Sequence, residues 1–308
     1  MTLRVVAGSA HPTLARAVAM GLGVEVAGSR VERFPDGEVR PEIESVRGDD
    51  VYVVQPTVPP VNEHLVELAL LIDACRRSGA ARVTAVAPYF GYARQDRRTR
   101  SGQGIGATVA LGMLATADAD RLVVMDPHPP AFEAMSTIPT LTLTAATVMI
   151  EALTAAHLDP TIVVAPDLGA LKRAERFGAA LGLPVAVVQK SRQSSTVVQA
   201  LDLVGDVAGR RALIVDDMIA TGATIAAAAR LLTSRGGEPV AVLATHGLFV
   251  GETAAWLGSL GGATSMVTDT VPAGRAAPEG LEVVGVGPLL AEAIGRLHAE
   301  RSIEDLLG

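Results

Sequence analysis

The sequence predicts an α/β fold in two domains, each a mainly parallel β-sheet flanked by helices. Apolar, β-branched runs alternate along the chain with longer helical patterns, which is the order typical of parallel sheets covered by helices. The runs are nearly continuous rather than interrupted by polar residues, as expected of strands buried on both faces. The chain has 308 residues, of which 49% are hydrophobic, so it is long enough to bury two cores.

Nine apolar runs are predicted as strands. In chain order they cover residues 3–9, 50–57, 82–90, 121–129, 161–167, 184–190, 211–219, 239–247 and 264–271. Helical patterns lie between them and are clearest at residues 61–79 and 171–182. Nine or ten strands fit two sheets better than one. We therefore predict domains at residues 1–145 and 146–308, and leave open whether the last helix packs back on the first domain.

Composition excludes several classes of protein. The net charge of −7 argues against a dedicated nucleic-acid binder. The single cysteine, Cys75, excludes a disulfide framework and a cysteine-rich metal site. The N-terminus lacks a signal-peptide pattern, and no apolar run reaches the roughly 18 residues of a membrane span. We expect a cytoplasmic protein with neither a nucleic-acid nor a membrane partner.

The strongest motif joins the end of the predicted strand 211–219 to an alanine-rich helix. Asp216 and Asp217 come directly after three apolar residues, and the turn 220–224 follows with two threonines and a glycine. Successive backbone N–H groups at a helix N-terminus bind phosphate, whereas carboxylates repel it and suit sugar hydroxyls or Mg²⁺. The pattern predicts a phosphorylated sugar as ligand. The alternative is an acidic strand end followed by an ordinary helix cap.

Lysine usage marks a second candidate. Only two of the 26 basic residues are lysines, Lys172 and Lys190. Coding bias explains the general depletion, but Lys190 stands at the carboxyl end of a predicted strand, where α/β proteins bind ligands. A compact ammonium fits a tight space better than a guanidinium does. Lys172 lies in an amphipathic helical pattern, so we interpret it as a solvated surface charge.

Several segments together resemble a known family. The stretch IVDDMIATGAT (214–224) resembles the phosphoribosyl-pyrophosphate binding motif of type I phosphoribosyltransferases. FPDGE (34–38), PYFGYARQDR (88–97) and THG (245–247) are similar to ribose-phosphate pyrophosphokinases, and the similarity runs from about residue 8 to the C-terminus. The resemblance implies two type I phosphoribosyltransferase-like domains, with ATP on the N-terminal side and ribose 5-phosphate on the C-terminal side. It also implies homo-oligomers and a Mg²⁺-dependent transfer of the ATP diphosphate to the 1-hydroxyl of ribose 5-phosphate, for nucleotide biosynthesis.

The resemblance assigns roles residue by residue. It implies that ATP is bound by Phe34, Asp36, Gly37, Glu38, Arg94, Gln95, Asp96 and His128. It implies that ribose 5-phosphate is bound by Asp216, Asp217, Ala220, Thr221, Gly222, Ala223 and Thr224. Lys190 and Arg192 match the catalytic lysine and its neighbouring arginine, and His128 and Asp167 match the metal residues. Histidine is a poor first ligand for Mg²⁺, so contact of His128 with phosphate or a metal-bound water is the alternative.

The sequence leaves two other functions open. Alanine stands at position 220, where the family commonly has an acid and where many phosphoribosyltransferases have alanine, so an enzyme that consumes phosphoribosyl pyrophosphate is one alternative. The FPDGE and ARQDR motifs argue against it because they imply an ATP site. The other alternative is a catalytically silent subunit, which could dispense with Lys190 and the paired acids. Oligomer size and regulation by phosphate or ADP stay open.

Overall fold

The computed structural model describes residues 1–156, 158–192, 198–260, 262–274 and 276–308, without the side chains of residues 190–192 and 198–201. The chain divides into two compact units. Unit 1 comprises Met1–Thr144, Thr270–Pro272 and Val286–Gly308, and unit 2 comprises Ala145–Asp269 and Ala273–Gly285. Residues 286–308 group with unit 1, although they follow unit 2 in the chain.

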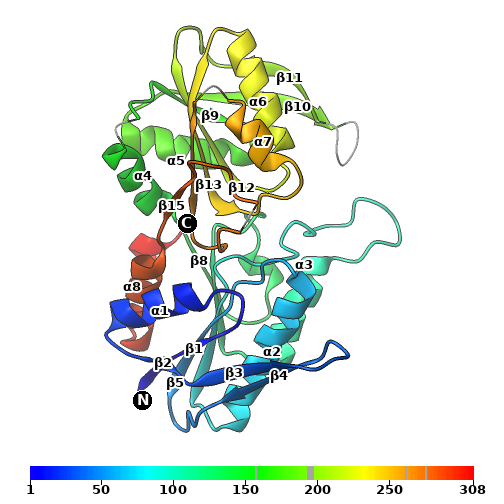
Figure 1. The fold of residues 1–308 in the computed structure, drawn as a ribbon, viewed down its shortest axis with the longest axis vertical. Coiled ribbons are helices and arrows are strands. Elements are labelled where there is room, and N and C mark those ends of the chain that lie inside the picture. The colour runs from blue at the N-terminus through cyan, green and yellow to red at the C-terminus, as the bar shows by residue number, and fades with distance from the viewer. Residues whose placement is uncertain (157, 193–197, 261, 275) are drawn as a thin grey trace. The chain divides into compact units, whose positions relative to one another are not determined.

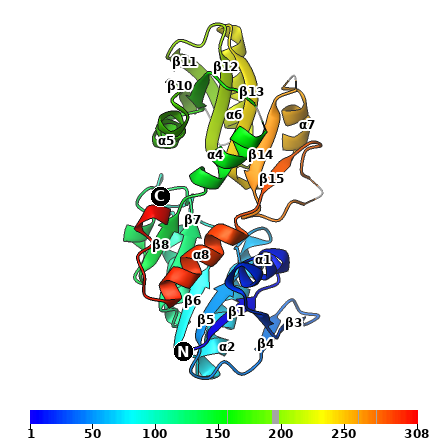
Figure 2. The same ribbon diagram turned by 90° about the vertical axis from the view of Figure 1, so that its left-hand side faces the viewer.

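Unit 1 is built on a six-stranded sheet in the order β2-β1-β5-β6-β7-β8, in which all neighbouring strands are parallel (Figure 1). Helices α1 and α8 cover one face of this sheet, and α2 and α3 cover the other (Figure 2). The strands are β1 (Leu3–Ala7), β2 (Val26–Ala27), β5 (Asp50–Val54), β6 (Arg82–Val86), β7 (Arg121–Met125) and β8 (Thr140–Leu143). The helices are α1 (Pro12–Leu22), α2 (Val61–Arg77), α3 (Gly106–Thr116) and α8 (Gly287–His298).

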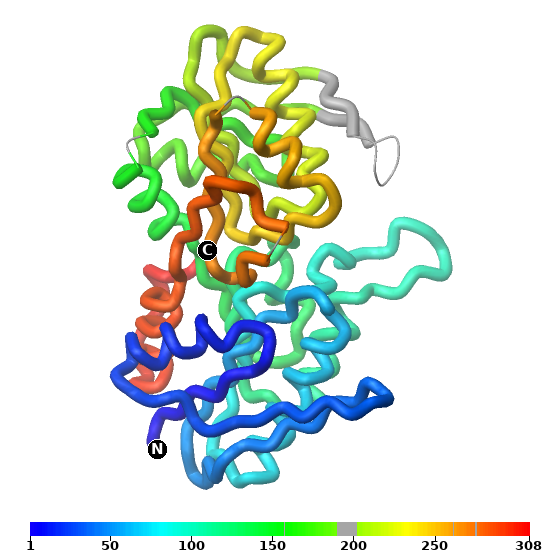
Figure 3. The backbone as a smooth tube through the Cα atoms, in the orientation of Figure 1, coloured from blue at the N-terminus to red at the C-terminus, as the bar shows by residue number. Residues whose placement is uncertain are grey.

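The last helix belongs to unit 1 because small residues let it approach α1 closely. A Cβ added to Gly21 would lie 2.7 Å from the Cβ of Ala291, and one added to Gly287 would lie 2.7 Å from the Cβ of Ala17. Figure 3 shows that the C-terminal part of the chain, which includes α8, lies beside α1. These contacts join segments from the two ends of the sequence. The local pattern of residues 286–308 therefore could not show to which domain those residues belong.

Unit 2 is built on a seven-stranded sheet in the order β11-β10-β9-β12-β13-β14-β15, in which only the β10–β11 pair is antiparallel (Figure 1). The strands are β9 (Ile162–Ala165), β10 (Val185–Arg192), β11 (Val198–Val204), β12 (Arg211–Ile219), β13 (Glu238–Gly247), β14 (Thr264–Thr268) and β15 (Glu282–Val284). The helices are α4 (Ala146–Ala155), α5 (Leu171–Leu181), α6 (Ala223–Ser234) and α7 (Thr253–Gly258). The predicted fold of two mainly parallel, helix-flanked sheets is confirmed.

All nine predicted strands are present. Of the six further strands in the described residues, five are short or polar, and the sixth is the seven-residue β11, which was also missed. Strands β2, β8 and β15 have two, four and three residues, too few for a periodic pattern. The antiparallel hairpin of β3 (Ser29–Arg33) and β4 (Val39–Ile43) forms a separate two-stranded sheet. Its strands mix charged with apolar residues and lie partly in solvent. Continuous apolarity therefore identifies the buried strands and not these.

The two large sheets share one strand order, since β2-β1-β5-β6-β7-β8 matches β10-β9-β12-β13-β14-β15 position by position. Strand β5 thus corresponds to β12, and the segments that follow them can be compared. After β5 the chain reads QPTVPP (55–60), whose three prolines have no N–H to donate. After β12 it reads ATGAT (220–224), in which every residue has one. The unit 2 segment therefore has five consecutive N–H groups, whereas the unit 1 segment has at most two in a row.

A buried acid connects α8 to the sheet of unit 1. Asp50 is 0% exposed and accepts hydrogen bonds from Arg82 Nε at 2.8 Å and from Tyr52 Oη at 3.2 Å. His298 Nδ1 at the end of α8 lies 2.7 Å from its Oδ2. Burial alone would raise the pKa of Asp50, but the hydrogen bonds from Arg82 and His298 outweigh it and hold the pKa below its usual value.

Asp50→Ala is expected to destabilise unit 1 by about 3–5 kcal/mol, because it leaves the half-buried guanidinium of Arg82 without the fully buried carboxylate that pairs with it. The contribution of Asp50 is present above its unfolded-state pKa and is lost as the pH falls through its lowered folded-state pKa. Urea unfolding followed by circular dichroism at neutral and acidic pH measures both effects. The control is Asp73→Ala, which removes an exposed ion pair with Arg77 and should leave the midpoint unchanged. Equal midpoints for both variants would contradict the assignment.

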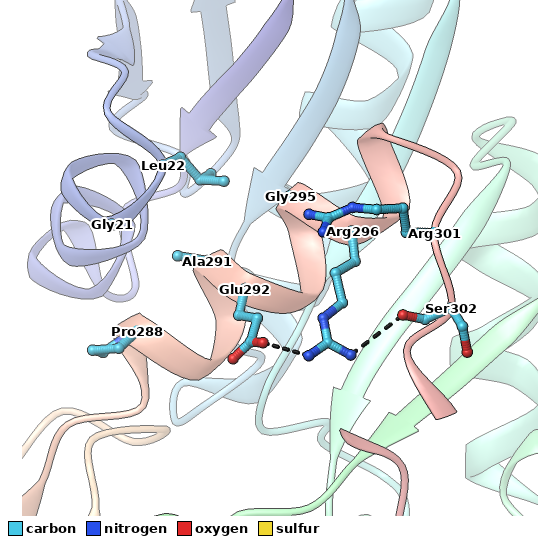
Figure 4. A pocket seen from close by; sticks show the side chains of 9 residues that line it. All are labelled: Gly21, Leu22, Pro288, Ala291, Glu292, Gly295, Arg296, Arg301 and Ser302. Atoms are coloured by element: carbon cyan, nitrogen blue, oxygen red, sulfur yellow. Dashed lines mark hydrogen bonds and ion pairs between the residues drawn. The ribbon is translucent and has the colours of Figure 1, made fainter. Parts of the chain in front are cut away.

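A cavity of about 610 Å³ lies against α1 and α8 in unit 1 (Figure 4). Gly21, Leu22, Pro288, Ala291, Glu292, Gly295, Arg296, Arg301 and Ser302 line it. The Arg296 guanidinium bonds Glu292 and Asp305 and donates to the carbonyl oxygen of Ser302 at 3.3 Å. Arg296 therefore connects the C-terminal segment to α8 through these bonds. No residue predicted for the functional site lines this cavity.

Within the described ranges, no helix is both long and apolar enough to cross a bilayer.

Candidate functional site

The turn that follows β12 forms the N-terminus of α6. Gly222 is the N-cap, with φ of +70°, a conformation that glycine adopts without strain. The first helical hydrogen bond runs from Ala226 N–H to Gly222 O at 2.9 Å. Among the residues that the structure describes, none accepts a hydrogen bond from the N–H of Thr221, Gly222 or Ala223. These amides and the helix dipole make the turn a suitable anion site.

The carboxylates predicted beside this turn are brought together. Asp217 is 5% exposed, and its N–H donates to Asp216 Oδ1 at 2.9 Å. Burial raises the pKa of Asp216 well above its ordinary value, and the carboxylates of Asp217 and Asp167 raise it further. The guanidinium of Arg173, 3.9 Å from Asp216 Oδ1, acts in the opposite direction. The carboxylates of Asp216 and Asp217 are hydrogen-bond acceptors, so this part of the site suits ligands that donate hydrogen bonds.

Asp167 and Arg173 reach this site from the segment after β9. Asp167 Oδ1 accepts the Ala170 N–H at 3.1 Å, which fixes the turn that leads into α5. Arg173 lies one turn further on, while its neighbour Lys172 is exposed. Sequence reasoning missed Arg173, because the amphipathic pattern of α5 marks the face of the helix but not which basic residue meets a neighbouring strand end.

Lys190 and Arg192 lie in β10, beside β9. The ladder with β11 shifts register between Gln189 and Lys190, and Lys190 then pairs with Ala200. Strand β9 pairs with β10 only as far as Val187, so Lys190 continues past the carboxyl end of β9, on the edge of the sheet where Asp167 follows. The side chains of Lys190 and Arg192 lie outside the described part of the structure.

In unit 1 the FPDGE segment is the turn between β3 and β4. Phe34 N–H donates to Glu38 O at 2.8 Å, and Glu38 N–H donates to Asp36 Oδ1 at 3.1 Å. Asp36, Gly37 and Glu38 are exposed, whereas Phe34 is half-buried. The guanidinium carbon of Arg40 lies 5.1 Å from the centre of the Phe34 ring. The turn therefore presents one aromatic face and two carboxylates at the tip of a hairpin.

The other residues predicted for unit 1 follow β6 and β7. Asp96 pairs with Arg97 Nη2 at 2.8 Å, and this hydrogen bond lowers the pKa of Asp96 against the opposing effect of burial. A weaker electrostatic effect of His128 acts on the pKa of Asp96 in the same direction. Arg94 and Gln95 are exposed beside them. Among the described residues nothing pairs with the Arg94 guanidinium, which leaves it available to an anion.

The candidate metal residues, His128 and Asp167, belong to different units. In the part of the chain that the structure describes, no three His, Cys, Asp or Glu side chains are placed to hold a metal ion together. Mg²⁺ usually takes one or two carboxylates and completes its shell with water and substrate phosphates. The carboxylate oxygens of Asp167 and Asp216 suit such partial coordination, and the imidazole of His128 suits it less well.

Comparisons with known proteins agree over nearly the whole chain. Residues 3–117 match the N-terminal domain of ribose phosphate pyrophosphokinase, and residues 193–308 match the phosphoribosyl synthetase-associated domain. A ribose-phosphate pyrophosphokinase of Parasynechococcus marenigrum is 39% identical over 99% of this chain and 93% of its own length. One of Nostoc sp. is 40% identical over the same shares. The crystal structure of phosphoribosylpyrophosphate synthetase from Mycobacterium smegmatis superposes with a TM-score of 0.90 at 35% identity, covering 97% of this chain and 100% of that one.

Proposed function

The chain belongs to the ribose-phosphate pyrophosphokinase family, and from this we propose that it converts ATP and ribose 5-phosphate into 5-phosphoribosyl 1-diphosphate and AMP. The observation that carries the proposal is the similarity over both units at once. A phosphoribosyltransferase would account for unit 2 but not for the N-terminal match at residues 3–117. A silent subunit would not need the charged turn after β12. Neither alternative is supported.

We assign ribose 5-phosphate to the segment from Asp216 to Thr224. The N–H groups of Thr221, Gly222 and Ala223 have no protein acceptor among the described residues, so the 5-phosphate can accept from them without displacing an existing bond. Ribose hydroxyls would donate to Asp216 and Asp217. Such bonds to ionised acceptors are shorter and stronger than neutral ones, and they would stabilise the ionised form of Asp216, whose pKa burial and the neighbouring carboxylates raise.

We assign ATP to unit 1. Adenine is apolar on its faces and carries an exocyclic amine. The Phe34 ring suits the faces, and the carboxylates of Asp36 and Glu38 suit the amine. Gly37 has no side chain that would stand between these groups and the base. Arg94 and Gln95 would bind the phosphates, since a guanidinium donates in a fork that matches phosphate oxygens. We assign Asp96 and His128 to the same group beside the phosphates, and the electrostatic effect of His128 on Asp96 supports this assignment.

The proposed reaction is a displacement at the β-phosphorus of ATP. The 1-hydroxyl oxygen forms a bond to that phosphorus, the bond to the α–β bridging oxygen breaks, the hydroxyl proton is lost, and AMP departs. Positioning and cations on the phosphoryl oxygens lower the barrier to such a transfer. We propose that the cationic side chains of Lys190 and Arg192 act on these oxygens. Mg²⁺, when bound, would neutralise phosphate charge. Asp167 in unit 2 is one candidate ligand, and His128 in unit 1 is a separate candidate, either directly or through a metal-bound water.

We expect AMP to appear only when ATP, ribose 5-phosphate and a divalent cation are all present. Chromatographic measurement of AMP, with each component left out in turn and with EDTA added, checks this. EDTA should abolish the rate and excess Mg²⁺ should restore it, because the substrate phosphates are otherwise unneutralised. AMP formed without ribose 5-phosphate would indicate ATP hydrolysis, and no AMP at all would refute the proposed function.

We further infer from the family that copies of this chain associate with one another and that the enzyme works in the cytoplasm. Self-association predicts a molar mass above 31.7 kDa. Size-exclusion chromatography with light scattering measures that mass directly, and a monomer at assay concentrations would contradict the inference.

A further inference from the structure

We propose that Trp256 is a positioning residue for ribose 5-phosphate, which holds the phosphate-binding amides of the turn 220–224 in place. This inference rests on the proposed function and names a residue that no sequence motif assigned to the site. Trp256 is the only tryptophan of the chain and lies in the short helix α7, packed partly against the core of unit 2.

The indole touches the turn in two ways. Its Nε1–H donates to the carbonyl oxygen of Thr221 at 3.3 Å. Its ring lies against Gly222, where an added Cβ would come within 2.0 Å of Trp256 Cζ2. The ring therefore occupies one whole side of the N-cap residue of α6 and leaves only the other side for a ligand.

The segment around Trp256 binds three successive carbonyls of the turn. Leu248 N–H donates to Ile219 O at 2.9 Å, and Val250 N–H donates to Ala220 O at 3.0 Å. The hydroxyl of Thr253 also lies 2.7 Å from Ala220 O, and Trp256 binds the next carbonyl, that of Thr221. The residues 248–256 thus act as one support along the turn.

This support determines where the amides point. In a planar trans peptide the C=O of one residue and the N–H of the next face opposite ways. Because the carbonyls of Ala220 and Thr221 face the supporting segment, the N–H groups of Thr221 and Gly222 face away from it. Those are the amides that lack an acceptor among the described residues. Trp256 therefore fixes the peptide plane that carries the Gly222 donor.

The backbone of the support is itself held in an uncommon conformation. Phe249 has φ of +44°, rare for a non-glycine residue and costly without strong constraints. Its ring is 4% exposed and packs on Gly247, where an added Cβ would lie 2.6 Å from Cε2 of that ring. Strain retained in this way is typical of segments that shape a binding site, which agrees with the role given to residues 248–256.

The test compares Trp256→Phe with Trp256→Ala in steady-state kinetics. Phenylalanine keeps a ring but loses the N–H, so the KM for ribose 5-phosphate should rise about fivefold, the usual effect of one neutral hydrogen bond. Alanine also removes the ring and should raise it about tenfold or more. In both variants the KM for ATP should stay within about twofold. An unchanged KM for ribose 5-phosphate, or equal rises for both substrates, would overturn the proposal.

The matched control is Leu257→Ala, the next residue of the same helix. Leu257 is 3% exposed and packs in the core of unit 2 rather than on the turn. The Leu257→Ala substitution should lower the melting temperature at least as much as Trp256→Phe does, while leaving the KM for ribose 5-phosphate unchanged. A rise in KM for Leu257→Ala equal to that for Trp256→Phe would mean that loss of packing alone explains the effect, and would also overturn the proposal.

A second measurement uses the tryptophan as its own reporter. Saturating ribose 5-phosphate should change the emission of the wild-type protein, because the phosphate would bind on the opposite side of the peptide to which the indole donates. If ribose 5-phosphate changes the emission but no AMP is formed, the proposed function fails and the positioning role stands. If AMP is formed while both emission and variant KM values are unaffected, the positioning role fails alone.

Discussion

Lys190→Ala is expected to lower kcat by about a hundredfold to a thousandfold, the usual loss when one fixed donor to a charged transition state is removed. The chain has a single other lysine, Lys172, which is exposed on α5 and provides a matched control of the same residue type. Lys172→Ala should leave kcat unchanged. Rates of AMP release at saturating ATP and ribose 5-phosphate measure both.

Lys190→Arg separates charge from shape. If position 190 requires a compact ammonium, arginine should restore only part of the lost rate, although this chain otherwise uses arginine for nearly all its basic residues. A folded Lys190→Ala protein with wild-type kcat would refute the catalytic role. Circular dichroism and the melting temperature establish that the variant is folded.

Asp216→Asn is expected to abolish most of the activity and to stabilise the fold. Burial and the carboxylates of Asp217 and Asp167 raise the pKa of Asp216, so at neutral pH its ionised form is unfavourable in the folded state. Asparagine keeps an oxygen for the Asp217 N–H but carries no charge. A carboxylate that binds ribose hydroxyls accepts charge-assisted bonds that an amide cannot replace, so kcat/KM for ribose 5-phosphate should fall by more than about tenfold.

The stabilisation has a defined pH dependence. A carboxyl whose folded-state pKa is raised costs stability as the pH rises from its unfolded to its folded value, since the unfolded chain releases the proton first. The melting temperature of Asp216→Asn should exceed that of the wild type at neutral pH, and the difference should vanish below the unfolded-state pKa. Asp206→Asn, at an exposed acid of the same unit, should change neither quantity. A variant that is less stable than the wild type at neutral pH would contradict this account.

Local patterns were sufficient for the elements whose structure depends on local chemistry. Strands such as β5 and β12 are buried along most of their length, so uninterrupted apolarity identified them. The turn at 220–224 was recognisable because small residues follow two acids at a strand end. Strands β3 and β4 were missed because their partly exposed, charged residues do not make an apolar run.

The remaining features depend on contacts between distant parts of the sequence. Arg173 reaches Asp216, and Trp256 reaches Gly222, across 43 and 34 residues of chain, and neither helix pattern shows which neighbour it will meet. The same holds for α8, which joins unit 1 through Gly21, Gly287 and Asp50. Sequence alone predicted the acids and donors of the proposed site, but not the neighbouring residues, Arg173 and Trp256, that contact them.

The central claim is that the segment from Asp216 to Thr224 binds ribose 5-phosphate. A crystal structure of the protein with ribose 5-phosphate, Mg²⁺ and an ATP analogue tests it most directly. We predict the 5-phosphate within hydrogen-bond distance of the N–H groups of Thr221, Gly222 and Ala223, with ribose hydroxyls on the carboxylates of Asp216 and Asp217. A fully occupied ribose 5-phosphate bound elsewhere, with those amides in contact only with solvent, would contradict the account.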